Sequence, residues 1–277
     1  MRKTMRVLLV LFLSVFITSV SGASEELPQQ IDEQATAQAP WKKGETIKKS
    51  RSFYTNFLGI TTQGLYLAQE FYTNDNEKLS DPYYLVCPDK MIDKDKFGEA
   101  CKATGHFVRW HQNGQKMSEG RYQDGKQHGL WTQWHQTGEK VMEERYQDGK
   151  KQGLSTSWNY NGKKYEEGHY KDDKRQGIWT VWYYNGQKLA EVHFQNGKTQ
   201  GLWTSWHDNG KKATEERYKD GKKHGLVTAW YKDGQKWREG SFQDGKLHGL
   251  WIYWHENGQK KEERHYQDDK LISHQEF

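Results

Sequence analysis

Large hydrophobic residues are scarce in this chain, which is 33% hydrophobic and 29% charged over 277 residues. Such a composition is too lean for a globule of this length with a deep core. Aromatic residues nevertheless make up 14% of the chain, whereas disordered chains are poor in aromatics. All tryptophans except Trp41 lie between residues 105 and 272, so we expect the buried surface there. A thin core that continues from one repeated unit to the next fits this composition.

The chain also lacks a strong excess of charge. Arg2, Lys3 and Arg6 contribute three of the formal net charge of +5, and residues 1–23 contain no acidic residue. Without that segment the chain is close to neutral. Because nucleic-acid binding needs a concentrated basic face, we expect no nucleic-acid partner.

The first 23 residues have the pattern of an export signal. A basic start is followed by an apolar run from Val7 to Val20 and by the small residues Ser21 and Ala23. Fourteen apolar-rich residues are too few to span a bilayer comfortably, but they suit a signal-peptide core. We predict cleavage near Ala23 and a periplasmic or extracellular protein. An uncleaved membrane anchor is the alternative. A lipid-anchored lipoprotein would need a cysteine at the cleavage site, and the sequence has none there.

Two further segments precede the regular part of the chain. Residues 24–52 are polar, and we interpret them as a flexible linker. Aromatic residues return in 53–104, which we predict to be a degenerate N-terminal cap repeat. The only cysteines, Cys87 and Cys101, lie in this cap. In an exported chain we expect two cysteines to form a disulfide, and free thiols are the alternative.

From residue 105 onward the sequence repeats every 24 residues, and glycine opens each of seven copies without insertion or deletion. A fixed period of this size is the signature of a repeat array. We number unit positions from that glycine, so that Gly201 is position 1 of the fifth unit. Lysine is constant at position 12, glutamate at position 15 and an aromatic residue at position 18. Tryptophan is constant at position 6: Trp110, Trp134, Trp158, Trp182, Trp206, Trp230 and Trp254.

Each unit contains the signals of a β-hairpin. The run from Leu202 to Trp206 is rich in aromatic and β-branched residues and predicts a strand. Asn209-Gly210 supplies a turn, Lys211 to Tyr218 a return strand, and Asp220-Gly221 a second turn. The predicted fold class is therefore all-β. Residues 105–277 form an elongated array of seven hairpin repeats with a C-terminal cap, joined in a meandering antiparallel sheet.

Strand alternation places positions 2, 4 and 6 on one face of this sheet and positions 3 and 5 on the other. Because the first face is nearly constant, we predict that it is the buried spine, in which the position-6 tryptophans have a structural role. Position 3 varies more, so its aromatic residues are candidates for contact with a partner. The binding candidates are Trp131, Trp179, Trp203, Trp251 and, at position 5, Tyr253.

A family resemblance rests on these residues. Asp-Gly-Lys-x-His-Gly-Leu-Trp, at 124–131 and 244–251, resembles the MORN repeat. The continuation Trp-x-x-Asn-Gly-x-Lys-x-x-Glu resembles its bacterial variant, an antitoxin-type MORN-variant family. The resemblance covers 105–272 and implies a MORN-like solenoid that serves as a scaffold and attaches to proteins or membranes. The antitoxin-type label implies neutralisation of a partner protein.

No pattern in the sequence indicates catalysis or metal binding. Histidines recur at the repeat spacing, but neighbouring hairpins stand roughly 10 Å apart, twice the strand spacing. Zinc ligands must lie within about 2 Å of one ion. The position-15 glutamates have equivalent environments, whereas catalysis by two carboxyls needs different ones, so we predict Lys–Glu pairing across strands instead. We expect no catalytic residues, no metal and no cofactor.

These observations favour an exported, non-catalytic scaffold that binds another protein through its aromatic sheet surface, because interfaces favour Tyr, Trp and Arg. Binding of a glycan or cell-envelope polysaccharide through Trp179, Trp203 and Trp251 is an alternative. The family resemblance adds attachment to a membrane surface, or an antitoxin or immunity role against a partner toxin. The solvent accessibility of positions 3 and 6 decides which residues are available for any of these roles.

Overall fold

The computed structural model describes residues 30–37, 39, 43–49, 51–63, 65–87 and 101–277. The predicted signal peptide, residues 1–23, lies outside the described residues. No helix that the described residues form has the length and apolar character needed to cross a membrane.

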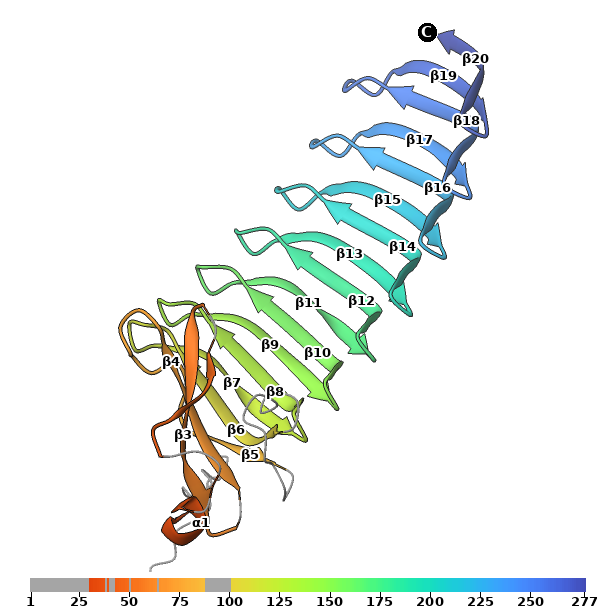
Figure 1. Ribbon diagram of the computed structural model, residues 1–277. Helices are drawn as coiled ribbons and strands as arrows, with labels where there is room; N and C mark the ends of the chain where they lie inside the picture. The colour runs from red at the N-terminus through yellow and green to blue at the C-terminus, as the bar shows by residue number, and fades with distance from the viewer. Residues whose placement is uncertain (1–29, 38, 40–42, 50, 64, 88–100) are drawn as a thin grey trace, which may run out of the picture.

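The predicted all-β class is confirmed. Twenty antiparallel strands form one sheet, which Figure 1 shows as a long open array of hairpins. The N-terminal part comprises β1 (Ile31–Asp32), α1 (Glu33–Ala37), β2 (Thr46–Lys49), β3 (Phe53–Thr61), β4 (Tyr66–Tyr72) and β5 (Tyr83–Val86). The repeats comprise β6 (Lys102–Trp110), β7 (Lys116–Gln123), β8 (Lys126–Trp134), β9 (Lys140–Gln147), β10 (Lys150–Trp158), β11 (Lys164–Lys171), β12 (Lys174–Trp182), β13 (Lys188–Gln195), β14 (Lys198–Trp206), β15 (Lys212–Lys219), β16 (Lys222–Trp230), β17 (Lys236–Gln243), β18 (Lys246–Trp254), β19 (Lys260–Gln267) and β20 (Lys270–Glu276).

The first strand of each hairpin is longer than the sequence predicts. In the fifth unit β14 begins at Lys198, and the repeat glycine Gly201 lies inside the strand with a φ of +74°. This conformation suits glycine and produces a β-bulge, at which the pairing with β13 shifts register between Val192 and Phe194. The repeat glycine is thus a bulge residue within the strand and not its boundary.

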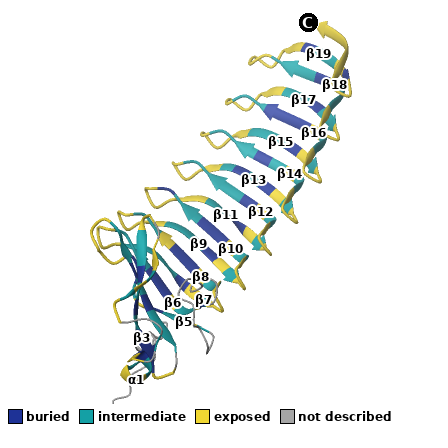
Figure 2. Ribbon diagram, viewed as in Figure 1, coloured by how far each residue is buried: buried dark blue, intermediate teal, exposed yellow. Residues whose placement is uncertain are grey.

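The core is thin and follows the middle of the strands, where Figure 2 shows most of the buried residues, while the turns are exposed. One cluster joins the N-terminal part to the first two repeats. It contains Phe57, Ile60, Ala68, Tyr83, Leu85, Cys101, Phe107 and Trp131. A second cluster, near the C-terminal end, contains Val227, Trp251 and Tyr266.

The interpretation of residues 24–52 as a flexible linker is wrong for much of the described part. β1 and β2 both pair with β3, and α1 packs beside it. The Oγ1 of Thr36 accepts a hydrogen bond from the N–H of Ile60 at 2.8 Å and is buried. Ala35 and Ile47 pack against the N-terminal core. A few small apolar residues thus hold this polar segment on the sheet.

The predicted disulfide is confirmed, because Cys87 and Cys101 are bonded to each other. The N-terminal part also reproduces contacts of the repeats. Lys78 forms an ion pair with Asp81 at 3.2 Å, and its Nζ lies 4.7 Å from the ring centroid of Trp110. The Tyr72 hydroxyl donates to the carbonyl of Trp110 at 3.0 Å. The first repeat therefore meets a neighbour that resembles another repeat.

Candidate interaction surfaces

The two faces of the sheet follow from the strand register. Trp203 lies directly opposite Glu216, and Leu202 lies opposite Arg217. Directly opposed residues of an antiparallel pair share a face. Positions 3, 5, 14, 16, 18 and 23 therefore form one face, which we call the core face. Positions 2, 4, 6, 12, 15 and 17 form the other, which we call the ladder face.

Three of the predicted binding tryptophans are buried in the core face. Trp131, Trp179 and Trp251 are 5%, 2% and 0% exposed. Each indole lies over a glycine at position 16 of the preceding unit, where an added Cβ would meet the ring at 2.2 Å. Each indole N–H also donates to a backbone carbonyl, at 3.1 to 3.2 Å. The prediction that these side chains face a partner is wrong, because they form part of the core.

The residue at position 16 determines what position 3 of the next unit can be. Where position 16 is glutamate, the opposed residue is small, as in the pairs Glu144–Ser155 and Glu216–Val227. Where it is valine, Val192 opposes Trp203, which is only half-buried. A groove of about 590 Å³ opens beside Trp203. Trp203 is therefore the position-3 tryptophan that remains accessible to a partner.

Tyr253, the remaining binding candidate, also lies in the core face. It is half-buried, its ring stacks on Trp251 with centroids 6.4 Å apart, and the guanidinium of Arg264 lies 5.1 Å from its centroid. Burial raises the pKa of its hydroxyl. Its contacts are those of a core residue at the edge of the packed region.

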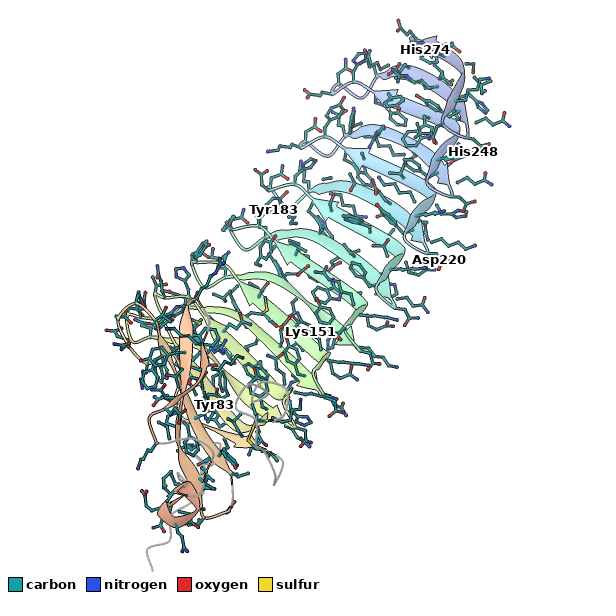
Figure 3. All side chains as sticks on the ribbon, in the orientation of Figure 1. Tyr83, Lys151, Tyr183, Asp220, His248 and His274 are labelled. Atoms are coloured by element: carbon teal, nitrogen blue, oxygen red, sulfur yellow. A yellow bond between two sulfur atoms is a disulfide. The ribbon has the colours of Figure 1, made fainter. Side chains whose placement is uncertain are left out.

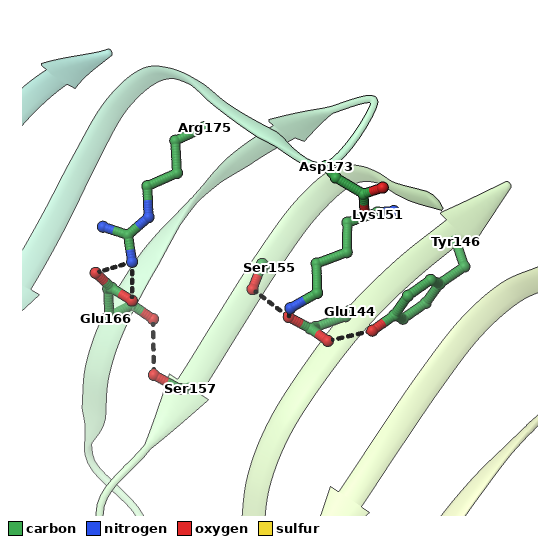
Figure 4. Close-up of polar contacts among 8 residues, drawn as sticks. All are labelled: Glu144, Tyr146, Lys151, Ser155, Ser157, Glu166, Asp173 and Arg175. Carbon is green, nitrogen blue, oxygen red and sulfur yellow. Dashed lines mark hydrogen bonds and ion pairs between the residues drawn. The ribbon is translucent and has the colours of Figure 1, made fainter. Parts of the chain in front are cut away.

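The core face also contains buried charges, and each of those in Figure 4 has a partner. Glu144 forms an ion pair with Lys151 and accepts hydrogen bonds from the Tyr146 hydroxyl at 2.7 Å and the Ser155 hydroxyl at 3.4 Å. Burial, together with the hydrogen bond to Glu144, raises the pKa of Tyr146. Because a buried charge without a partner is costly, these pairs are explained by stability.

Also in Figure 4, Glu166 pairs with Arg175 at 2.9 Å. The guanidinium of Arg175 in turn lies 4.0 Å from the ring centroid of Trp179. This arginine therefore joins an ion pair to a buried indole, and both of its contacts lie on the core face.

The ladder face carries a regular line of contacts between units. In every unit the lysine at position 12 forms an ion pair with the glutamate at position 15 of the same strand. The predicted pairing across strands is therefore wrong. In units one to six the lysine Nζ also lies 5.5 to 5.9 Å from the ring centroid of the position-6 tryptophan of the next unit. Burial alone would raise the pKa of Glu119 and Glu167, but hydrogen bonds from Lys116 and Lys164 lower it overall.

The predicted buried spine, made of positions 2, 4 and 6, is wrong in part. The position-6 tryptophans are half-buried, and Thr204 at position 4 is buried. Position 2, by contrast, is exposed, by 42% to 61% in units two to seven. We call these side chains the aliphatic row: Leu130, Leu154, Ile178, Leu202, Leu226 and Leu250.

Arginine or histidine side chains lie on the neighbouring strands, opposite the residues of the aliphatic row. At position 17, Arg145 lies opposite Leu130, His169 opposite Leu154, His193 opposite Ile178 and Arg217 opposite Leu202. All four position-17 residues are exposed. The result is an amphipathic stripe along the ladder face. Its signal in the sequence was the aliphatic residue at position 2 of units two to seven, which we interpreted as buried.

A second accessible feature lies at the hairpin turns of units two to four. A cavity of about 210 Å³ is lined by aromatic residues and a few polar groups. We call it the aromatic notch, with His135, Glu139, Lys140, Val141, Trp158, Asn159, Tyr160, Tyr165 and Tyr184 as its lining. Sequence reasoning missed this site, although its signal was visible as tyrosine at position 8 in two adjacent units.

The recurring histidines and glutamines at position 24 contact backbone N–H groups of the turns. The side-chain oxygens of Gln152, Gln176 and Gln200 accept backbone N–H groups of the second turn one unit later, at 2.8 to 3.0 Å. Nδ1 of His224 lies 3.5 Å from the N–H of Asp244 at the equivalent place. The described residues contain no group of three or more His, Cys, Asp or Glu side chains that could hold a metal ion.

Six segments of the chain match the model of the MORN repeat variant family: residues 103–124, 151–172, 175–196, 199–220, 223–244 and 247–268. No curated protein matches the chain. The matched segments have the period of the hairpins, with one period, between 124 and 151, left unmatched. With its open sheet of 24-residue hairpins, the chain is therefore a MORN-repeat protein.

Proposed function

We propose that the chain is an exported, non-catalytic scaffold that binds another protein along the ladder face. The observation that carries the proposal is the aliphatic row, six side chains in register along consecutive units. Large apolar side chains exposed in a line are typical of interaction surfaces. Repeat arrays in general use such extended surfaces for binding.

The stripe also indicates the chemistry of the partner. Arg145 and Arg217 lie beside leucines of the row, so a partner that presents apolar side chains flanked by carboxylates is complementary to it. Export is supported by the pattern of residues 1–23 and by the Cys87–Cys101 disulfide, which suits an oxidising compartment. The predicted aromatic platform is less suitable, because Trp131, Trp179 and Trp251 are buried.

The test replaces Leu202 and Leu226 with glutamine in the full chain. Both side chains are exposed, by 42% and 53%, so the fold should be retained, as circular dichroism would verify. Affinity isolation from the envelope fraction should return a stoichiometric partner with the original chain. The double variant should bind it at least tenfold more weakly, because each leucine buried at an interface contributes about 1–2 kcal/mol.

A matched control is Val86→Gln, which removes an exposed apolar side chain of 44% exposure outside the row. This variant should bind the partner as the original chain does. Repeated isolation without a stoichiometric partner, or a partner bound equally by the double variant, would contradict the proposal.

A further inference from the structure

The aromatic notch departs from the repeat pattern at position 8. That position is polar in five units, with Gln112, Gln136, Asp208, Lys232 and Glu256. In units three and four it is tyrosine, and Tyr160 and Tyr184 are 77% and 67% exposed. These are the largest exposed fractions among the large hydrophobic side chains of the described residues. Nothing in the packing of the hairpins explains two exposed rings at this place.

The notch is built from three consecutive units. His135 comes from unit two, and its ring meets that of Tyr160 edge to face with centroids 5.3 Å apart. Trp158 forms part of the lining, and the Nζ of Lys140 lies 5.8 Å from its ring centroid. Tyr184 follows Tyr183, which Figure 3 labels at the turn end of its hairpin. The rings therefore line an open cavity at the turns.

The polar groups of the notch are suited to hydroxyl groups. Glu139 supplies a carboxylate whose pKa is lowered by a hydrogen bond from the Thr137 hydroxyl. The side-chain oxygen of Asn159 accepts the N–H groups of Asn161 and Lys163, and its amide N–H groups have no acceptor among the described residues. The lining contains one lysine, Lys140, and one carboxylate, Glu139, so their charges balance. Aromatic rings with a few hydrogen-bonding groups match a neutral ligand that has both apolar faces and hydroxyls.

The repeat spacing narrows the ligand class further. Tyr160 and Tyr184 occupy the same position of adjacent hairpins, two strands apart, or about 10 Å. In an extended β-1,4-linked polysaccharide successive sugars are turned over, so every second sugar presents the same apolar face. One disaccharide has about the length of one repeat. Two tyrosines one repeat apart can therefore stack on alternate sugars of a single chain.

We propose that the aromatic notch binds an extended β-1,4-linked polysaccharide, with Tyr160 and Tyr184 as stacking platforms. The carboxylate of Glu139 accepts hydrogen bonds from sugar hydroxyls, and the amide N–H groups of Asn159 donate hydrogen bonds to them. The notch shares no residue with the aliphatic row, so substitutions can test the two sites separately.

The experiment titrates the full chain with β-1,4-linked oligomers of N-acetylglucosamine and of glucose, of increasing length, by calorimetry. Affinity for one of the two series should rise until the oligomer is long enough to reach both tyrosines. Tyr160→Ala and Tyr184→Ala should each weaken binding about tenfold, in the range expected for losing one stacking contact. Tyr184→Phe, which keeps the ring, should retain most of the affinity.

The matched control is Lys232→Ala, at the same position of unit six, and it should leave sugar binding unchanged. The Leu202 and Leu226 double variant should also bind sugar normally, which separates this test from that of the proposed protein interface. Two results would overturn the proposal: no binding of either series of oligomers, or an equal loss of binding in the control variant.

Discussion

Both faces of the sheet carry tryptophans, but the core face and the ladder face use them differently. On the core face, Trp179 lies flat over Gly168 and is 2% exposed. On the ladder face, Trp206 is half-buried and lies beneath the Nζ of Lys188, 5.5 Å from the ring centroid. The first contact depends on shape and excludes other side chains. The second depends on charge and tolerates exposure. The comparison shows that a variable position can be more buried than an invariant one.

The largest expected effect comes from removing a core-face indole. Trp251→Ala should lower the free energy of unfolding by about 3–5 kcal/mol, as for other large buried aromatics. Trp206→Ala should cost clearly less, about 1–2 kcal/mol, because its ring is only half-buried. Urea denaturation of the two variants would measure both. Equal losses would mean that the faces are equivalent.

A smaller effect should follow from exchanging the residues at position 16. Gly168→Val places a Cβ 2.2 Å from the Trp179 ring, so the indole must move, at a cost of about 1–3 kcal/mol. The reverse change, Val192→Gly, should let Trp203 settle onto the strand and close the neighbouring groove. Tryptophan fluorescence should shift to longer wavelength in the first variant and to shorter wavelength in the second. Unchanged spectra in both would contradict the coupling between positions 16 and 3.

The smallest effect on stability should come from removing one lysine of the ladder face. Lys164→Ala removes an ion pair with Glu167 and a contact with Trp182, and should cost no more than about 1 kcal/mol at neutral pH. Because the pKa of Glu167 is lowered in the folded chain, its pairing stabilises the fold above the ordinary glutamate pKa and is lost as the pH falls through the lowered value. The difference between variant and original chain should therefore shrink in acid. A difference that grows in acid would be inconsistent with this pairing.

Much of the fold could be predicted from the sequence because its signals are local. The Asp-Gly and Asn-Gly turns, the 24-residue period and the two cysteines all act through short-range geometry. The strand boundaries were missed because Gly201 at a φ of +74° ends a strand in most contexts but forms a bulge here. The packing of residues 31–37 depends on contacts with β3, which no local pattern reveals.

The exposed residues could not be predicted by assuming that the positions most constant across the repeats are the buried ones. Position 2 is aliphatic in six of the seven units but exposed. Position 3 varies because each of its residues must fit position 16 of the unit before it. The pairs Gly120–Trp131, Gly168–Trp179 and Gly240–Trp251 were present in the sequence. They become informative only when residues eleven positions apart are compared across the unit boundary.

The pairing of positions 16 and 3 also constrains how such an array can gain or lose units. Removal of residues 177–200 would bring Gly168 before Trp203, a combination that the chain already uses elsewhere. Removal of 153–176 would instead bring Glu144 before Trp179, where the indole needs the space of a glycine. Units of equal length are therefore not interchangeable, because only some junctions give the residue at position 3 the space that it needs.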